Sequence, residues 1–116
     1  MKVQIEALIE MADQRLAVGT GCQGYFKRGT TYKTLVKKLG KPNAGPSGDG
    51  KVKAEWIIRL KLHKHDAGAI FTIYDYKSDV APEKNTDWHI GGRDVALVPV
   101  LGQVLGIEVA GEAAGE

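Results

Sequence analysis

The side chains best suited to binding chemistry lie between residues 70 and 93. Residues 70–77 have the aromatic and apolar composition of a strand, and alternation places Tyr74 and Tyr76 on one of its faces. A polar loop follows, and residues 87–93 then add an indole, an imidazole, two adjacent glycines and a guanidinium. Aromatic rings stack on nucleobases with about 1–3 kcal/mol each, and arginine pairs with phosphate through parallel hydrogen bonds. This segment therefore predicts a site that holds a nucleotide-like ligand.

Each side chain of this segment has an expected role. Tyr74, Tyr76 and Trp88 are expected to stack on the ligand, His89 and Asp75 to hydrogen-bond its ribose or base, and Arg93 to pair with its pyrophosphate. Trp88 and His89 point to opposite sides of their strand, so one of them should accompany the tyrosines. The alternative for Tyr74 and Trp88 is an ordinary core aromatic, which is common in strands. The predicted ligand-binding residues are Tyr74, Asp75, Tyr76, Trp88, His89, Gly91, Gly92 and Arg93.

A glycine-rich segment forms a second candidate for ligand binding. The glycines from Gly19 to Gly24 match the spacing Gly-x-Gly-x-x-Gly, but no strand–helix–strand unit surrounds them, so a dinucleotide fold is rejected. Backbone N–H groups exposed by glycines, followed by Lys27 and Arg28, can still hold a phosphate. The alternative is a tight turn with a solvated basic rim.

The residue types give little support to a catalytic site or to a metal-binding site. His63, His65 and Asp66 lie together, but with His89 and Cys22 they do not match the compact spacings of zinc sites. Cys22 lacks the surroundings of a known nucleophile, and no Gly-x-Ser-x-Gly elbow occurs. The acids near the aromatic segments, Glu55, Asp75 and Asp87, are candidates for acid–base chemistry by position alone. We therefore expect no enzymatic activity, no metal and no cofactor.

The elements that must position these residues can be predicted from periodicity. Helical spacing covers 32–39, with Thr30 or Thr31 as N-cap and Gly40 as the end, and a second helix is expected over 95–105 with Asp94 as its cap. Strands are expected at 2–9, 15–18, 51–62, 70–77 and 88–90, the last of them broken by Gly91 and Gly92. The predicted fold is α+β, an antiparallel sheet of about five or six strands with two helices packed on it. Residues 1–106 would form one domain, and 107–116 a disordered tail.

Composition limits the class of protein further. A chain of 116 residues fits one domain, and its net charge of +2 is too small to suggest binding of duplex nucleic acid or a membrane surface. Cys22 is the one cysteine, which fits a reducing cytoplasm. We expect no signal peptide and no membrane span. A sheet with exposed edges and an exposed face also favours a homo-oligomer.

Five short motifs, taken in their order along the chain, resemble those of one protein family. They are Gly19–Tyr25, Thr31–Pro42, Lys51–Trp56, Thr72–Lys77 and Asp87–Gly92. The resemblance covers most of the chain, about residues 19–105, and it is to the first-described type of phage anti-Thoeris protein.

The resemblance implies a function without catalysis. Such proteins are sponges that bind cyclic ADP-ribose isomers made by a bacterial TIR-domain sensor, and members also take up cyclic oligonucleotides at a separate site. The resemblance implies an oligomer built from dimers, working in the cytoplasm of the infected host, with pockets at subunit contacts. It implies that the aromatic and Trp88–Gly92 region lines the ADP-ribose pocket. The implied second, phosphate-binding site consists of Gln23, Gly24, Lys27 and Arg28. The alternatives are a protein-binding inhibitor of a host defence factor and a small hydrolase of the signal.

Overall fold

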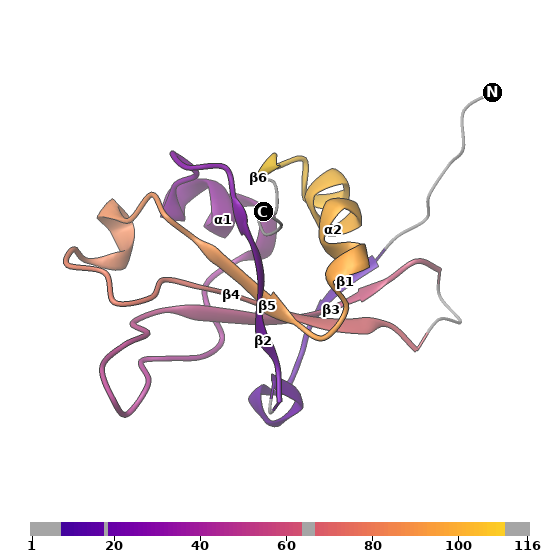
Figure 1. Ribbon diagram of the computed structural model, residues 1–116, viewed down its shortest axis with the longest axis horizontal. Coiled ribbons are helices and arrows are strands. Elements are labelled where there is room, and N and C mark those ends of the chain that lie inside the picture. Colours follow the sequence, from indigo (N-terminus) through magenta and orange to yellow (C-terminus); the bar gives the residue numbers. More distant parts are fainter. Residues whose placement is uncertain (1–7, 18, 64–66, 111–116) are drawn as a thin grey trace.

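The computed structural model describes residues 8–17, 19–63 and 67–110. In this part of the chain, six strands form one antiparallel sheet in the order β1-β3-β4-β5-β2-β6, with two α-helices over one face (Figure 1). The expected α+β fold, with about five or six strands and two helices, is confirmed. The strands are β1 (Leu8–Met11), β2 (Gly21–Phe26), β3 (Glu55–Lys61), β4 (Ala69–Tyr74), β5 (His89–Gly92) and β6 (Val109–Ala110). The α-helices are α1 (Tyr32–Leu39) and α2 (Val98–Leu105), and the 3-10 helices are η1 (Gln14–Ala17), η2 (Pro82–Lys84) and η3 (Val95–Leu97).

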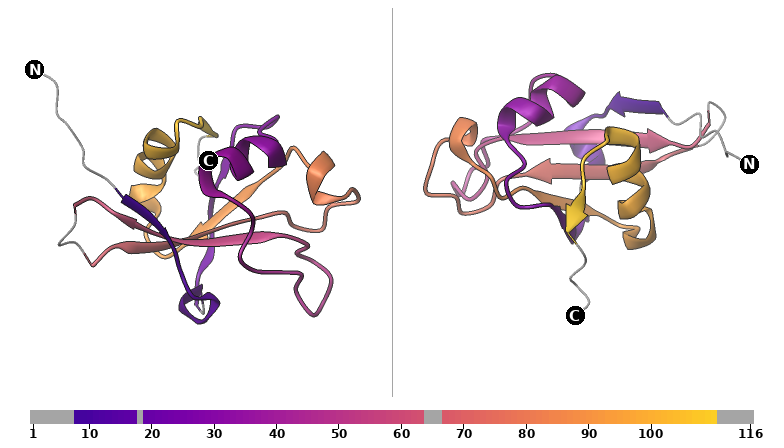
Figure 2. Two further views of the ribbon diagram at one scale, coloured as in Figure 1. Left: turned by 180° about the vertical axis from the view of Figure 1, so that it is seen from behind. Right: turned by 90° about the horizontal axis from the view of Figure 1, so that it is seen from above.

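The hydrophobic core lies between the sheet and the two helices, which cover the same sheet face (Figure 2). Alternate residues of β3 and β4 point into it, and the side chains of Trp56, Ile58, Phe71 and Ile73 are fully buried. Their neighbours in sequence point to the opposite face, which carries no α-helix. The sheet therefore has one face that builds the core and one that can meet a ligand.

Helix α1 has the boundaries that the sequence predicts. The Thr31 hydroxyl accepts a 3.1 Å hydrogen bond from the Thr34 amide and caps the first turn. Gly40 ends the helix with a φ of 84°, a conformation that favours glycine. Its carbonyl accepts a 2.8 Å hydrogen bond from the Trp56 indole, which fastens the end of the helix to β3.

Residues 15–17, expected in a strand, belong to the 3-10 helix η1 instead. The Asp13 carboxylate accepts hydrogen bonds from the Arg15 amide at 2.8 Å and from its guanidinium, and the Asp13 carbonyl accepts from the Leu16 amide at 2.9 Å. An aspartate that bonds to the backbone two residues ahead favours a turn over an extended strand.

Gly91 and Gly92 do not break their strand, contrary to the expectation. Both lie in β5, which pairs with β4 on one side and with β2 on the other. Pairing on both sides supplies the hydrogen bonds that hold the glycines extended. A side chain at Gly92 would be tightly placed, because its Cβ would lie 3.1 Å from Phe71 Cδ1 and 3.2 Å from the Ile70 carbonyl.

The chain is ordered from residue 107 to residue 110, where the sequence predicts a disordered tail. Ile107 is buried, its amide donates to the Gly102 carbonyl at 3.0 Å, and Val109 pairs with Phe26 in β6. These two apolar side chains pack on the α2 side of the core, which orders the chain as far as Ala110. Residues 111–116, like residues 2–7 of the expected first strand and residue 18, lie outside the described residues.

The other expected elements agree in position but differ in length. The strand expected at 51–62 is β3 at 55–61, and that expected at 70–77 is β4, which ends at Tyr74. The expected last helix begins as η3 and becomes α-helical only at Val98. Asp94 does cap it, since its carboxylate accepts a 3.2 Å hydrogen bond from the Ala96 amide. Among the described residues, no helix has the length and hydropathy to cross a membrane.

Removing the cap of α1 should lower stability measurably. We expect Thr31→Ala to reduce the free energy of unfolding by about 1 kcal/mol, because the Thr34 amide loses its acceptor. Urea denaturation followed by circular dichroism measures this. Thr86→Ala is the matched control, since Thr86 is exposed and its side chain makes no hydrogen bond within the described structure. Equal stability of the two variants would contradict the capping role.

Candidate functional site

The sheet face away from the helices carries a line of chemically active side chains. Strand pairing places Glu55 opposite Tyr74, Tyr74 opposite His89, and His89 opposite Tyr25. These four residues, here called the transverse row, come from β3, β4, β5 and β2 and cross the sheet in a single register. Since strands lie roughly 4.8 Å apart, the row spans about 14 Å.

The rings of the transverse row contact one another. The centroids of Tyr74 and His89 lie 5.4 Å apart at an interplanar angle of 26°, and Tyr25 meets His89 edge-on at 4.8 Å. Tyr76, beyond the end of β4, contacts the row from its side, 5.7 Å from His89 and 6.4 Å from Tyr74. Tyr76 is 41% exposed, and the other three rings are half-buried. The prediction that Tyr74 and Tyr76 share a face with one of Trp88 and His89 is thus confirmed, with His89 as the partner.

Burial decides the ionisation of the two central rings. It lowers the pKa of His89, while the charges of Asp87 and Asp75 act in the opposite direction. Burial also raises the pKa of Tyr74, and the neighbouring Cys22 acts in the same sense. The neutral imidazole and the neutral phenol are therefore the forms that this face favours. Cys22 Sγ lies 3.9 Å from His89 Nδ1.

Two hollows lie on either side of the Tyr74–His89 pair. One, of about 380 Å³, is lined by Tyr25, Phe26, Arg28, Asp87, His89 and Ala110. The other, of about 210 Å³, is lined by Thr20, Gly21, Val52, Glu55, Thr72, Tyr74, Tyr76 and Gly91. The first contains a guanidinium paired with a carboxylate, and the second contains a carboxylate alone, so the two ends of the transverse row differ in charge.

The two predicted glycines have different positions relative to this face. Gly91 lines the second hollow, where a Cβ would collide with Thr72 Oγ1 and approach Tyr74 Cε1 to 3.2 Å. The absence of a side chain therefore leaves the hollow open. Gly92 lies against Phe71 on the core side and does not line either hollow.

The prediction that Trp88 stacks on a ligand is wrong. Its side chain is fully buried on the core side, 5.4 Å from the Trp56 ring and 6.3 Å from the Tyr32 ring. Its indole N–H donates to the Asn85 carbonyl at 3.1 Å. Trp88 is therefore a core aromatic, because alternation turns it away from the face to which His89 belongs.

Asp75 is also placed away from the ligand face. It is fully buried, and its Oδ1 accepts hydrogen bonds from the amides of Lys53 at 2.8 Å and Ala54 at 3.1 Å. Among the described residues, no hydrogen bond reaches its Oδ2. Asp75 therefore holds the start of β3 against the end of β4, and its predicted contact with a ribose or base is not supported by this position.

Arg93 lies at the far end of β5, outside both hollows. Its Nη2 donates to the Leu16 carbonyl at 3.2 Å and thereby holds η1 to the sheet. The guanidinium next to the aromatic rings is that of Arg28, which lies 3.9 Å from the Asp87 carboxylate and is largely exposed.

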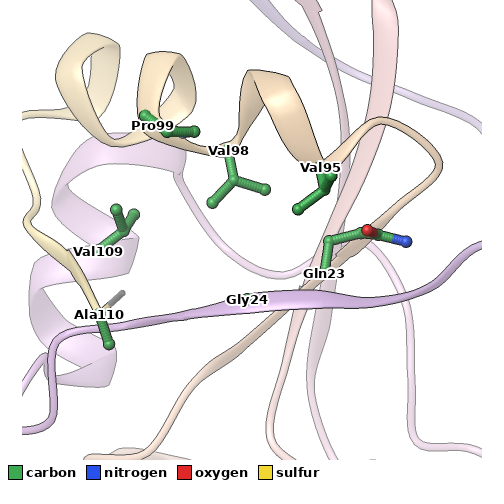
Figure 3. Close-up of a pocket in the computed structure, with 7 residues that line it drawn as sticks. All are labelled: Gln23, Gly24, Val95, Val98, Pro99, Val109 and Ala110. Atoms are coloured by element: carbon green, nitrogen blue, oxygen red, sulfur yellow. The ribbon is translucent and has the colours of Figure 1, made fainter. Parts of the chain in front are cut away.

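The predicted second site is divided between two places. Gln23 and Gly24 line a cavity of about 120 Å³ whose other walls are apolar: Val95, Val98, Pro99, Val109 and Ala110 (Figure 3). Gln23 Nε2 donates to the Gly92 carbonyl at 3.2 Å. Lys27 pairs with Glu108 at 3.4 Å, and Arg28 belongs to the aromatic hollow. The four residues therefore do not converge on one phosphate.

Sequence reasoning missed Tyr25 and Thr72 and treated Glu55 as a candidate by position alone. The pairing of β2 with β5 brings Tyr25 to His89 across more than sixty residues of chain, and no local pattern signals it. A bulge between Cys22 and Gly24 further shifts the register of that pairing.

A metal centre finds no support in the described part of the chain, which contains no group of three His, Cys, Asp or Glu side chains able to hold an ion. His63 is exposed at the end of the β3–β4 hairpin, and His65 and Asp66 lie outside the described residues.

Comparison with protein-family models, with curated proteins and with solved structures finds no match for the chain.

His89 should make folding stability sensitive to mild acid. Its folded-state pKa lies below 6.5, so the unfolded chain binds the proton more tightly and stability falls as the pH drops through 6.5 to the folded-state value. We expect His89→Gln to lose this part of the pH dependence between pH 7.5 and 5. Chemical denaturation across this range measures it. Identical slopes for both proteins would contradict burial of the neutral imidazole.

Proposed function

We propose that the protein is a non-enzymatic phage anti-defence protein that binds and sequesters cyclic ADP-ribose-type immune signals, with cyclic oligonucleotides as a further ligand class. The observation that carries this proposal is the set of three contacting rings in the transverse row, which lie half-buried on a sheet face beside Arg28. Rings of this kind stack on bases of any sequence. The choice of a cyclic ADP-ribose isomer rests on the resemblance of the ordered motifs to anti-Thoeris proteins.

A second copy of the chain would complete such a site. A ligand lying on the row would be covered by protein from below only, whereas tight small-ligand sites bury most of the ligand surface. Two sheets facing each other across the ligand would supply that burial. We therefore include a homo-oligomer built from dimers in the proposal.

The positions of the acids favour binding over hydrolysis. A general base at His89 would be helped by a carboxylate that orients its ring. Asp75 Oδ1 accepts two backbone amides instead, and Asp87 lies beside Arg28. Among the hydrogen bonds of the described residues, none joins His89 to either acid.

The decisive experiment recovers the ligand. Purified protein is incubated with cyclic ADP-ribose isomers, the protein is removed by filtration, and the filtrate and the heat-released material are analysed by mass spectrometry. We expect the intact isomer to be missing from the filtrate and to appear after heating. A converted product would indicate the hydrolase, and an isomer left free would indicate the protein-binding inhibitor; either result would overturn the proposal.

Substitutions in the row should weaken retention in proportion to lost stacking. We expect Tyr74→Leu to raise the Kd roughly 5- to 150-fold, since one stacked ring contributes about 1–3 kcal/mol, and Tyr74→Phe to bind almost as the wild type.

Arg28→Gln should weaken binding about tenfold through loss of a phosphate contact. Its matched control is Arg15→Gln, because Arg15 is also exposed and paired with a carboxylate but lies on η1. Calorimetric titration measures these values, and equal Kd values for Tyr74→Leu and the wild type would remove the row from the site.

A further inference from the structure

The two ends of the transverse row carry different charged groups. The row begins at Glu55 in β3 and ends at Tyr25 in β2, and Arg28 lies beside Tyr25 in the same hollow. Between them stand the rings of Tyr74 and His89. A ligand that lies along the row therefore meets the Glu55 carboxylate at one end and the Arg28–Asp87 ion pair at the other.

The Glu55 carboxylate is unpaired in the described structure. The side chain is half-buried, and among the described residues no hydrogen bond or ion pair reaches it. Burial raises its pKa, and the negative charge of Asp75 raises it further. A half-buried carboxylate without a partner lowers stability, so a protein gains from supplying one.

The rest of this hollow suits a flat, positively polarised group. Its walls include the rings of Tyr74 and Tyr76, and its floor is kept open by Gly91. Lys77 Nζ already lies 5.4 Å from the Tyr76 ring centroid, which is within the range of a cation–π contact. This lysine does not line the hollow.

An anion is disfavoured here by the same groups. A phosphate in this hollow would face the charge of Glu55, whereas a cation or an amine would satisfy the Glu55 carboxylate and contact the ring faces. We infer that the Glu55 hollow is a subsite for a cationic or amine-bearing ring, with the phosphate end of the same ligand at Arg28. The assignment of the two ends rests on the function proposed above.

The test uses phosphate-free nucleosides, so that Arg28 has no role. The probes are 1-methyladenosine, whose base is positively charged at neutral pH, and inosine, whose base is neutral and has no exocyclic amine. We expect the wild-type protein to bind 1-methyladenosine at least about tenfold more tightly, because a charged hydrogen bond adds roughly this factor. Glu55→Gln, which keeps the shape of the side chain, should abolish the preference.

Two controls accompany the variant. Glu83→Gln changes the charge equally at an exposed residue of η2 that lies outside both hollows, and it should keep the wild-type preference. Glu55→Gln should not unfold the protein. The raised pKa of Glu55 means that ionisation of this carboxyl lowers the stability of the wild type as the pH rises above 4.5. The glutamine of the variant does not ionise, so the variant should melt no lower than the wild type at neutral pH.

The outcomes separate this inference from the proposed function. Equal affinity of the wild type for the two nucleosides, binding of neither, or a preference that survives in Glu55→Gln would overturn the subsite. If cyclic ADP-ribose isomers are retained while the preference is absent, the proposed function stands and the subsite fails. If the preference depends on Glu55 while no isomer is retained, the cation subsite stands and the proposed function fails.

Discussion

The pairing of β5 with β4 on one side and with β2 on the other is the interaction on which the rest of the structure depends. It aligns Tyr74, His89 and Tyr25 on one face of the sheet and, through alternation, places Ile90 and Trp88 toward the other. A register slip of one residue would exchange the two faces of β5. The core and the candidate site are therefore set by the same hydrogen bonds, and a change of register would alter both.

The glycines of β5 make this double pairing possible at close range. On the core side, Gly92 gives room to the Phe71 ring, and on the ligand side, Gly91 gives room to Thr72 and Tyr74. Glycine in a strand weakens it, because the residue loses more conformational entropy and contributes no side chain to packing. A central position with hydrogen bonds to two neighbours offsets that loss. This explains why the pair continues the strand, although in the sequence it resembles a break.

Local patterns were enough to predict the fold class and α1, and distant contacts were needed for the rest. Helix α1 is specified by its own cap, its own apolar stripe and Gly40, all within ten residues. The alternation in β3 likewise identifies which side chains reach the core. The faces of Trp88 and His89 were left open, because alternation says only that they differ, and the choice depends on Tyr32 and Trp56 packing against the indole. Strand β6 depends on pairing with β2, and its two residues carry no strand signal of their own.

The candidate site follows the same division between local and distant information. The tyrosines of the β4 segment are visible as a pair in the sequence, but their partners Tyr25 and Glu55 reach them only through the sheet. Sequence reasoning therefore found the rings and named Asp75 and Arg93 as their charged partners, whereas the structure places Glu55 and Arg28 beside the rings. Asp75 and Arg93 are each engaged with backbone groups, and these bonds hold the start of β3 and η1 in position. Polar residues close to the aromatic segment in sequence can thus support the architecture, while the side chains that share a sheet face with its rings come from strands far along the chain. In this sheet the charged groups of the transverse row come from the segments at its two ends: β3 provides Glu55, and the residues after β2 provide Arg28, which is paired with Asp87.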